Sequence, residues 1–192
     1  MTETTVETGE TRRGGLGRLV RDVTGAATIE FALVAPLIFA IFFSVLEAGI
    51  LMTRTVMLER AVSLTVRDLR IDNIDSSLLN EEGLKQVVCN RAIVFADCTQ
   101  SIALDLVPLG DSFGASLANQ IATETSCVDR TATDPNPVVT VDPGSRTENM
   151  FVRVCVVVDP ILPGIGLGLR LPKDASGGVR ISTFSAFRNE PE

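Results

Sequence analysis

The residue types that could support catalysis in this chain are few. The sequence of 192 residues contains no histidine, so a Ser-His-Asp triad, a Cys-His pair and a histidine-containing zinc site are all excluded. Acidic residues such as Glu81 and Glu82 show no spacing typical of a metal or catalytic site, and we expect them on the solvated surface. The sequence therefore predicts a protein that is not an enzyme and binds no cofactor.

Cysteine is the other reactive residue type, and its four copies all follow a long apolar segment: Cys89, Cys98, Cys127 and Cys155. No two of them have C-x-x-C spacing, which argues against redox and zinc-knuckle motifs. In an exported domain an even count indicates disulfides, and four thiols allow three fully paired connectivities. We favour Cys89 with Cys98, which a short loop separates, and Cys127 with Cys155. The alternative is that Cys155, flanked by two valines, is a buried free thiol.

The elements that position these residues begin with the apolar segment near the N-terminus. Residues 26–52 contain only two ionisable side chains, Glu30 and Glu47. About 20 apolar residues in a helix cross a hydrocarbon core of about 30 Å, so we expect a transmembrane helix here. A secretory signal peptide is the competing interpretation, but its apolar region covers only about 7–15 residues and ends at a small-residue cleavage site. The longer segment in this chain favours anchoring over release.

The charges around this segment predict its orientation. Residues 1–25 are polar and carry four arginines close ahead of the apolar residues, and positively charged flanks stay in the cytoplasm. We therefore expect a cytoplasmic leader over 1–25, with everything after about Thr53 in an oxidising compartment outside. Glu30 and Glu47 are separated by about 26 Å of helix, so we expect them near opposite membrane interfaces. Glu47 is interpreted as a marker of the exit from the membrane.

A helical pattern continues beyond the predicted membrane segment. Apolar residues recur there at spacings of four, four and three: Leu58, Val62, Val66 and Leu69. This is the period of one helix face. We therefore expect residues 53–70 to extend the membrane helix as an amphipathic stalk, ahead of an extracytoplasmic domain over 71–192.

Residues 71–192 predict a small α+β domain. Asn80 is a candidate N-cap for a helix from Glu81 to Asn90, and apolar residues four apart indicate a second short helix from Phe113. Alternating or β-branched segments predict strands, and these segments are 102–107, 138–141, 151–159 and 179–187. The expected fold is α+β and pilin-like: a long N-terminal transmembrane helix continuing into a stalk, then an antiparallel sheet of three or four strands with short helices.

Two further features argue against nucleotide and nucleic-acid binding. Residues 163–170, PGIGLGLR, superficially resemble a phosphate-binding loop, but the G-x-G-x-x-G spacing and the following Lys-Ser/Thr are absent. We interpret them as a flexible apolar loop, with a partner or the membrane surface as candidate contacts. The net charge of −7 argues against nucleic-acid binding.

The start of the apolar segment resembles a class III signal. The sequence VTGAATIEFALVAP, from Val23 to Pro36, has a polar leader ending in Gly25 and a glutamate, Glu30, at the fifth position after it. In proteins of this kind a prepilin peptidase cuts after the glycine, which implies a new N-terminus at Ala26. The resemblance makes Glu30 an assembly residue whose partner is the freed amine of a neighbouring subunit. The alternative is a hydrated carboxylate at the cytoplasmic interface.

Two more stretches are similar to the TadE-like minor pilins, or pseudopilins, of the tight-adherence (Tad/Flp) system. One is IEFALVAPLIF followed by Glu47-Ala48-Gly49, and the other is the ending FRNEP, residues 187–191. The related TadF group shares this plan and is not separated from TadE by these motifs.

The resemblance implies a function and a location for the chain. It implies a non-enzymatic minor pilin that takes part in assembling a Tad (Flp) pilus for adherence. Its location would be the bacterial inner membrane, and its partners a prepilin peptidase, other Tad pilins and components of the pilus machine. The competing function is a signal-anchored periplasmic binding or adaptor module unrelated to pili.

Overall fold

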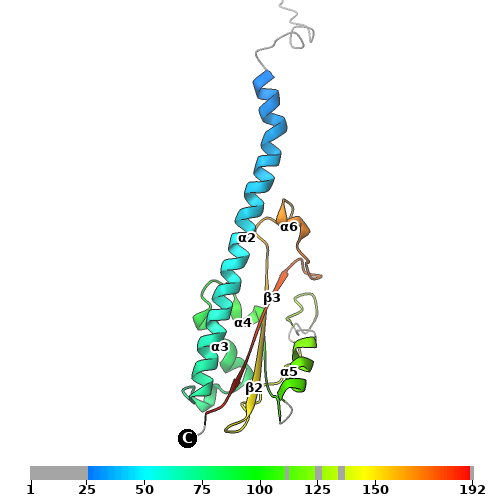
Figure 1. The fold of residues 1–192 in the computed structure, drawn as a ribbon. Coiled ribbons are helices and arrows are strands. Elements are labelled where there is room, and N and C mark those ends of the chain that lie inside the picture. The colour runs from blue at the N-terminus through cyan, green and yellow to red at the C-terminus, as the bar shows by residue number, and fades with distance from the viewer. Residues whose placement is uncertain (1–25, 111–112, 124–126, 134–136, 191–192) are drawn as a thin grey trace, which may run out of the picture. The chain divides into compact units, whose positions relative to one another are not determined.

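The structure is a computed structural model that describes residues 26–110, 113–123, 127–133 and 137–190. Over these residues the fold is α+β, as expected: one long helix precedes short helices and a three-stranded antiparallel sheet (Figure 1). The chain divides into two compact units, with the boundary between Ala40 and Ile41.

Helix α2 (Ala26–Arg70) is the first described element and contributes residues to both units. In the first unit its large apolar side chains are exposed, as at Phe31 and Leu33. In the second unit the same helix buries one face, where Leu58 and Val62 are almost inaccessible. The apolar residues spaced by four, four and three in the sequence therefore mark the face of α2 that packs on the domain core.

Short helices follow α2, beginning with α3 (Glu81–Arg91). The side chain of Asn80 accepts a hydrogen bond from the Gly83 amide at 2.9 Å, so the expected N-cap is present. Helix α4 (Cys98–Ser101) is a single turn, and α5 (Phe113–Ala122) is the second helix expected from the apolar spacing.

Three strands form the sheet in the order β1-β2-β3: β1 (Ile102–Pro108), β2 (Asn149–Val158) and β3 (Val179–Arg188). Both pairings are antiparallel, with Leu104 opposite Val154 and Val154 opposite Thr183. The three strands correspond to three of the four segments expected from the sequence.

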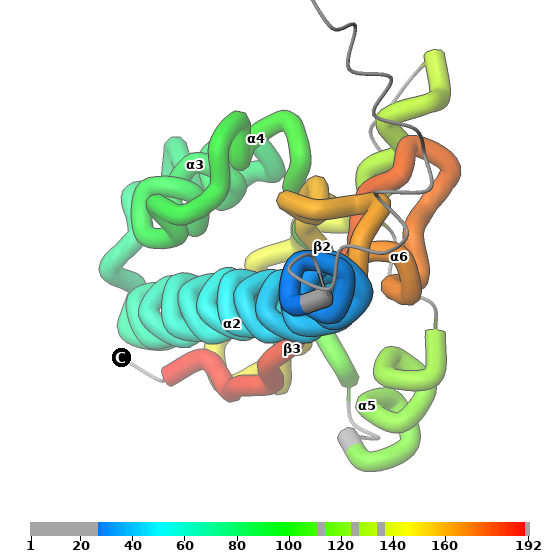
Figure 2. The backbone as a smooth tube through the Cα atoms, turned by 90° about the horizontal axis from the view of Figure 1, so that it is seen from above, coloured from blue at the N-terminus to red at the C-terminus, as the bar shows by residue number. Residues whose placement is uncertain are grey.

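The central strand β2 is buried along almost its whole length because both sheet faces are covered. On one face, Val154 and its alternate neighbours pack with residues of α2 and α3 in the main core. On the other face, Phe151 stacks on Phe184 of β3 with ring centroids 5.9 Å apart. Figure 2 shows α2 and α5 on opposite sides of these strands.

A buried arginine connects α5 to the second sheet face. Arg153 of β2 donates to the carbonyl oxygens of Gln120 and Thr123, at 3.2 and 3.1 Å. The same guanidinium pairs with Asp105 of β1 at 3.1 Å, and both side chains of this ion pair are largely buried. This charge is therefore matched inside the domain, as a buried charge must be.

One expectation from the sequence is wrong. Residues 138–141 do not form a strand: only Val141 makes a bridge, to Leu106 of β1, and Val138 is 98% exposed. Pro137 and Pro143 flank this segment, and proline interrupts sheet pairing because it has no amide hydrogen. The glycine-rich residues 163–170, which we expected to form a flexible loop, include the short helix α6 (Leu167–Arg170).

Candidate functional site

The predicted processing and assembly residues lie at the start of α2. Gly25 lies outside the described residues, and Ala26 is the first residue of the helix. Glu30 is exposed, and within the described ranges it has no hydrogen bond or ion pair. A carboxylate in an apolar stretch is normally matched by a partner, and the described residues supply none for Glu30.

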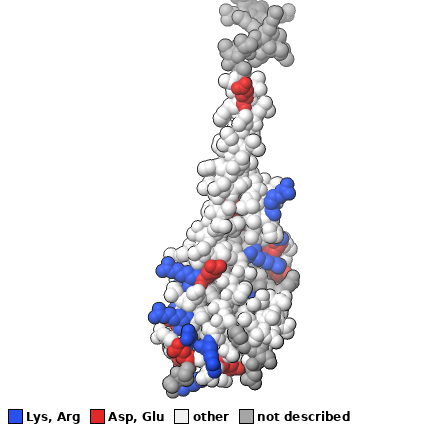
Figure 3. All heavy atoms as spheres, in the orientation of Figure 1, with Lys and Arg blue, Asp and Glu red and all other residues white. Residues whose placement is uncertain are grey.

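The helix surface between Glu30 and Glu47 is uncharged and apolar. Figure 3 shows this stretch without acidic or basic atoms on the visible face. Leu37 is 65% exposed and Ile41 is 60% exposed. Apolar surface of this extent marks a membrane or protein contact. Among the described residues α2 is the one helix long and apolar enough to cross a membrane, which is consistent with a single-pass membrane protein.

Glu47 has surroundings unlike those of Glu30. Its exposed fraction is 1%, and its carboxylate accepts two backbone hydrogen bonds. The Ile161 amide donates to Oε1 at 3.1 Å, and the Leu162 amide donates to Oε2 at 3.0 Å. Both donors belong to residues 160–173, which we call the foot loop. The sequence indicated only an exit marker at Glu47, because nothing near Glu47 in the chain points to these two distant amides.

Ser44 provides a second attachment for the foot loop. Its hydroxyl oxygen accepts a hydrogen bond from the Leu167 amide at 3.0 Å, at the first residue of α6. Ser44 and Glu47 are three residues apart on α2, so they lie on the same helix face. Together they bind three backbone amides of one loop.

Two glycines give the foot loop its conformation. Gly166 has φ +58°, a backbone region that side chains rarely allow. A Cβ on Gly168 would lie 2.1 Å from the carbonyl oxygen of Leu162, which is far inside contact distance. The glycines therefore permit a compact turn against α2, where the sequence suggested only flexibility.

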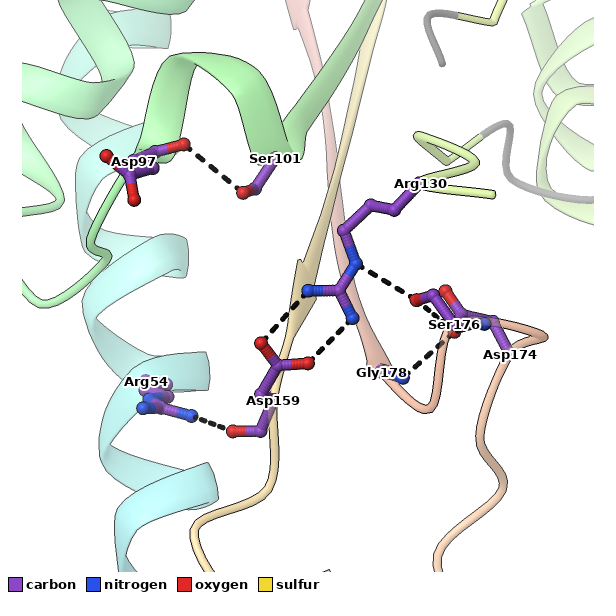
Figure 4. Close-up of polar contacts among 8 residues, drawn as sticks. All are labelled: Arg54, Asp97, Ser101, Arg130, Asp159, Asp174, Ser176 and Gly178. Atoms are coloured by element: carbon purple, nitrogen blue, oxygen red, sulfur yellow. Dashed lines mark hydrogen bonds and ion pairs between the residues drawn. The ribbon is translucent and has the colours of Figure 1, made fainter. Parts of the chain in front are cut away.

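A polar cluster around Arg130 holds the two ends of the foot loop together (Figure 4). The Arg130 guanidinium donates to both carboxylate oxygens of Asp159, at 3.0 and 2.7 Å, and to the Ser176 hydroxyl at 3.0 Å. Asp159 directly precedes the loop and Ser176 closely follows it. Arg54 of α2 donates to the Asp159 carbonyl oxygen at 3.0 Å. Asp159, at the start of the loop, is thereby connected to the same helix that binds the loop amides.

The ionisation of this cluster follows from its hydrogen bonds. The bonds from Arg130 hold the pKa of Asp159 below its ordinary value, and the same bonds raise the pKa of Arg130. Burial raises the pKa of Asp174, but hydrogen bonds from Ser176 and Gly178 outweigh burial, so that pKa is also lowered. All three groups are therefore charged at neutral pH.

Two disulfides connect the four cysteines, and their pairing coincides with the connectivity favoured from the sequence. Cys89 of α3 is bonded to Cys98 of α4, with Cα atoms 5.7 Å apart. Cys127 is bonded to Cys155 of β2, with Cα atoms 5.3 Å apart. The second bond fixes the short segment that carries Arg130 to the central strand.

The C-terminal ending packs against the loop before β2 and against the last residue of α2. Arg188 donates to the Thr147 carbonyl at 2.7 Å, and the Asn189 side chain donates to the carbonyls of Pro143 and Ser145. Glu190 forms a salt bridge with Arg70, the last residue of α2, at 3.0 Å. The residues of the FRNEP ending that the structure describes thus bind a turn and a helix end.

The contacts of these described residues are structural. Glu30 belongs to the first unit, and the four cysteines belong to the second. In the described part of the chain no group of three or more acidic or cysteine side chains could hold a metal ion.

Comparison with known proteins gives one match. Residues 25–67 match the family described as TadE-like protein, which is less than a quarter of the chain. No curated protein and no solved structure matches the chain. The matched segment contains Gly25, Glu30, Ser44 and Glu47. Residues 25–67 are therefore similar to TadE-like proteins, and this similarity supports an association with the Tad pilus.

Proposed function

We propose that this chain is a minor pilin of a Tad (Flp) pilus and that a prepilin peptidase cuts it between Gly25 and Ala26. The observation that carries the proposal is the TadE-like match, which begins at residue 25 and covers the apolar helix. The match starts at the glycine of the class III signal. The cut would leave the whole of α2 on the mature protein.

The proposal assigns Glu30 to assembly. Glu30 would be the fifth residue of the mature chain, and its exposed carboxylate has no partner within the described residues. The freed amine of Ala26 in a neighbouring subunit is a cation of suitable charge for it. Pairing between subunits would satisfy the carboxylate near hydrocarbon and select one register of assembly.

The proposal places the protein in the bacterial inner membrane as a single-pass chain. Residues 1–25 would be cytoplasmic until cleavage, and the domain after about Thr53 would be periplasmic. The arginines of the leader support this orientation. The two disulfides support an oxidising location for the second unit. Partners would be the prepilin peptidase, other Tad pilins and parts of the pilus machine.

Deletion and complementation of the gene test the proposal. We expect the deletion strain to lose surface pili and adherence, and the wild-type gene to restore both. The processed chain should also be detected in sheared, purified pili or in the membrane fraction that assembles them. Normal pili and normal adherence in the deletion strain would contradict the proposal. That result would favour an anchored adaptor module unrelated to pili.

A further inference from the structure

The foot loop carries exposed apolar side chains that the proposed function does not use. Three of them have exposed fractions of 46–63%: Ile161, Ile165 and Leu169. The loop contains no acidic residue, and its charged residues are Arg170 and Lys173, although the chain as a whole has a net charge of −7. Apolar side chains beside cations are typical of surfaces that bind anionic lipid headgroups and the upper acyl chains.

The loop is attached to α2 at the place where the apolar span ends. A helix needs about 20 residues to cross the hydrocarbon core. A span of that length that starts at Ala27 ends near Leu46. Ser44 and Glu47, which bind the loop, lie on either side of that residue. A loop bound at this position meets the headgroup region of the bilayer.

We infer that the foot loop is a membrane-binding element that lies in the headgroup region of the outer leaflet. Its apolar side chains would enter the upper acyl region, and Arg170 would lie near lipid phosphates. This inference rests on the proposed membrane topology. It adds a lipid contact to the second unit, which would hold the domain against the membrane before the subunit leaves it for a pilus.

A second copy of the chain is the other occupant to consider for this surface. Two features favour lipid over a second copy. The loop lies at the end of a span whose own surface is apolar and exposed. The absence of acidic residues from residues 160–173 also suits the anionic phosphates of a bilayer.

Single tryptophans test the inference, because the chain contains no tryptophan. We would introduce Leu169→Trp into the full-length protein and reconstitute it in vesicles of phosphatidylcholine and phosphatidylglycerol. A fraction of the lipids would carry a quencher close to the headgroup. Two matched variants provide references: Leu37→Trp in the apolar helix, and Ile93→Trp, a residue 79% exposed and remote in sequence from the foot loop.

We expect the emission of the Leu169→Trp variant to shift to shorter wavelength and to lose intensity in the presence of the lipid quencher. The Leu37→Trp variant should also show a blue shift, and the Ile93→Trp variant should show neither change. If only Leu37→Trp responds to lipid, the inference is overturned while the membrane span stands. If Leu37→Trp does not respond either, the membrane topology and the inference fail together. A blue shift at Leu169→Trp that depends on protein density and not on the quencher would identify a second copy instead.

The attachment of the loop is tested by adding Glu47→Ala to the Leu169→Trp variant. We expect the loss of intensity caused by the lipid quencher to fall towards that of the Ile93→Trp variant. The Leu37→Trp reporter with the same change should keep its response, which shows that the protein is still inserted. Unchanged quenching at Leu169→Trp would overturn the assignment of Glu47 as the residue that holds the loop at the membrane.

Discussion

Glu30 and Glu47 are glutamates in the same apolar helix, yet their surroundings differ. Glu47 is 1% exposed and accepts two backbone hydrogen bonds from the foot loop. Glu30 is exposed, and the described residues supply no partner for it. A carboxylate near hydrocarbon is kept with a partner. Glu47 is thus satisfied by its own chain, whereas no described residue satisfies Glu30.

The largest effect is expected when the Glu30 carboxylate is removed, and it should appear in pilus assembly. We expect Glu30→Ala to be inserted in the membrane at a normal level but to abolish piliation, because the amine that we propose as the partner of Glu30 would lose its acceptor. Immunoblots of membranes, electron microscopy and an adherence assay measure the two properties separately. Normal piliation in this variant would reduce Glu30 to a passive, hydrated interface residue.

The next effect concerns the support of the foot loop. Replacing both Cys127 and Cys155 with alanine should lower the free energy of unfolding by about 3.5 kcal/mol in the chain-entropy model. The same change at Cys89 and Cys98 should cost about 2.5 kcal/mol, because the closed loop is shorter. Circular dichroism in denaturant can follow unfolding, since the chain has no tryptophan or tyrosine for fluorescence.

Non-reducing peptide mapping checks the pairing itself. We expect one linked peptide pair that contains Cys89 and Cys98 and another that contains Cys127 and Cys155. Free thiols in protein folded in the periplasm would contradict both disulfides.

Two substitutions of Glu47 test how much its two hydrogen bonds with the foot loop stabilise the protein. Glu47→Ala leaves two amides without an acceptor and should lower the free energy of unfolding by about 3 kcal/mol. Glu47→Gln keeps one carbonyl acceptor and should have a smaller effect. Limited proteolysis within residues 160–173 should follow the same order. Equal stability of the wild type and Glu47→Ala would show that the two hydrogen bonds are not important.

A pair of glycines tests whether the loop that binds Glu47 is a fixed structure. Gly168→Ala places a Cβ against the Leu162 carbonyl and should destabilise the loop by about 2 kcal/mol. Gly164→Ala meets no atom within 4 Å and serves as the control. If the two variants show the same protease sensitivity, the loop does not have the conformation described.

The smallest effect expected is on acid stability. Asp159 has a lowered pKa because of the bonds from Arg130, so its contribution is present above its unfolded value of about 3.8 and is lost as pH falls through the lower folded value. The side chain is 70% exposed, which limits the contribution to below about 1 kcal/mol. Asp159→Asn should therefore reduce the loss of stability below about pH 4. If Asp159→Asn leaves the pH dependence of the free energy of unfolding unchanged below about pH 4, the Arg130–Asp159 pair makes no contribution to acid stability.

The local parts of the fold could be predicted from the sequence. Helix α2, the Asn80-capped α3 and the three strands follow from apolar spacing, capping and β-branched runs that each act within a few residues. The segment 138–141 was misread because its valines suit a strand, while the flanking prolines limit its pairing to one bridge.

The contacts of the candidate site could not be predicted in the same way. Glu47 binds amides that are 114 and 115 residues away, and Ser44 binds one 123 residues away. Nothing in the local sequence of α2 identifies those partners. The sequence of residues 163–170 indicated a flexible loop, and only the approach of Leu162 to Gly168 shows why glycine is needed there.

N-terminal mass spectrometry of the membrane-extracted protein tests the central claim most directly, since Glu30 can pair with a neighbouring amine only if processing creates one at Ala26. In a strain with an active prepilin peptidase, the first peptide should begin at Ala26. A variant with a bulky residue in place of Gly25 should instead keep the full-length N-terminus. A wild-type chain that begins at Met1 in that strain would contradict both the processing and the assembly role of Glu30.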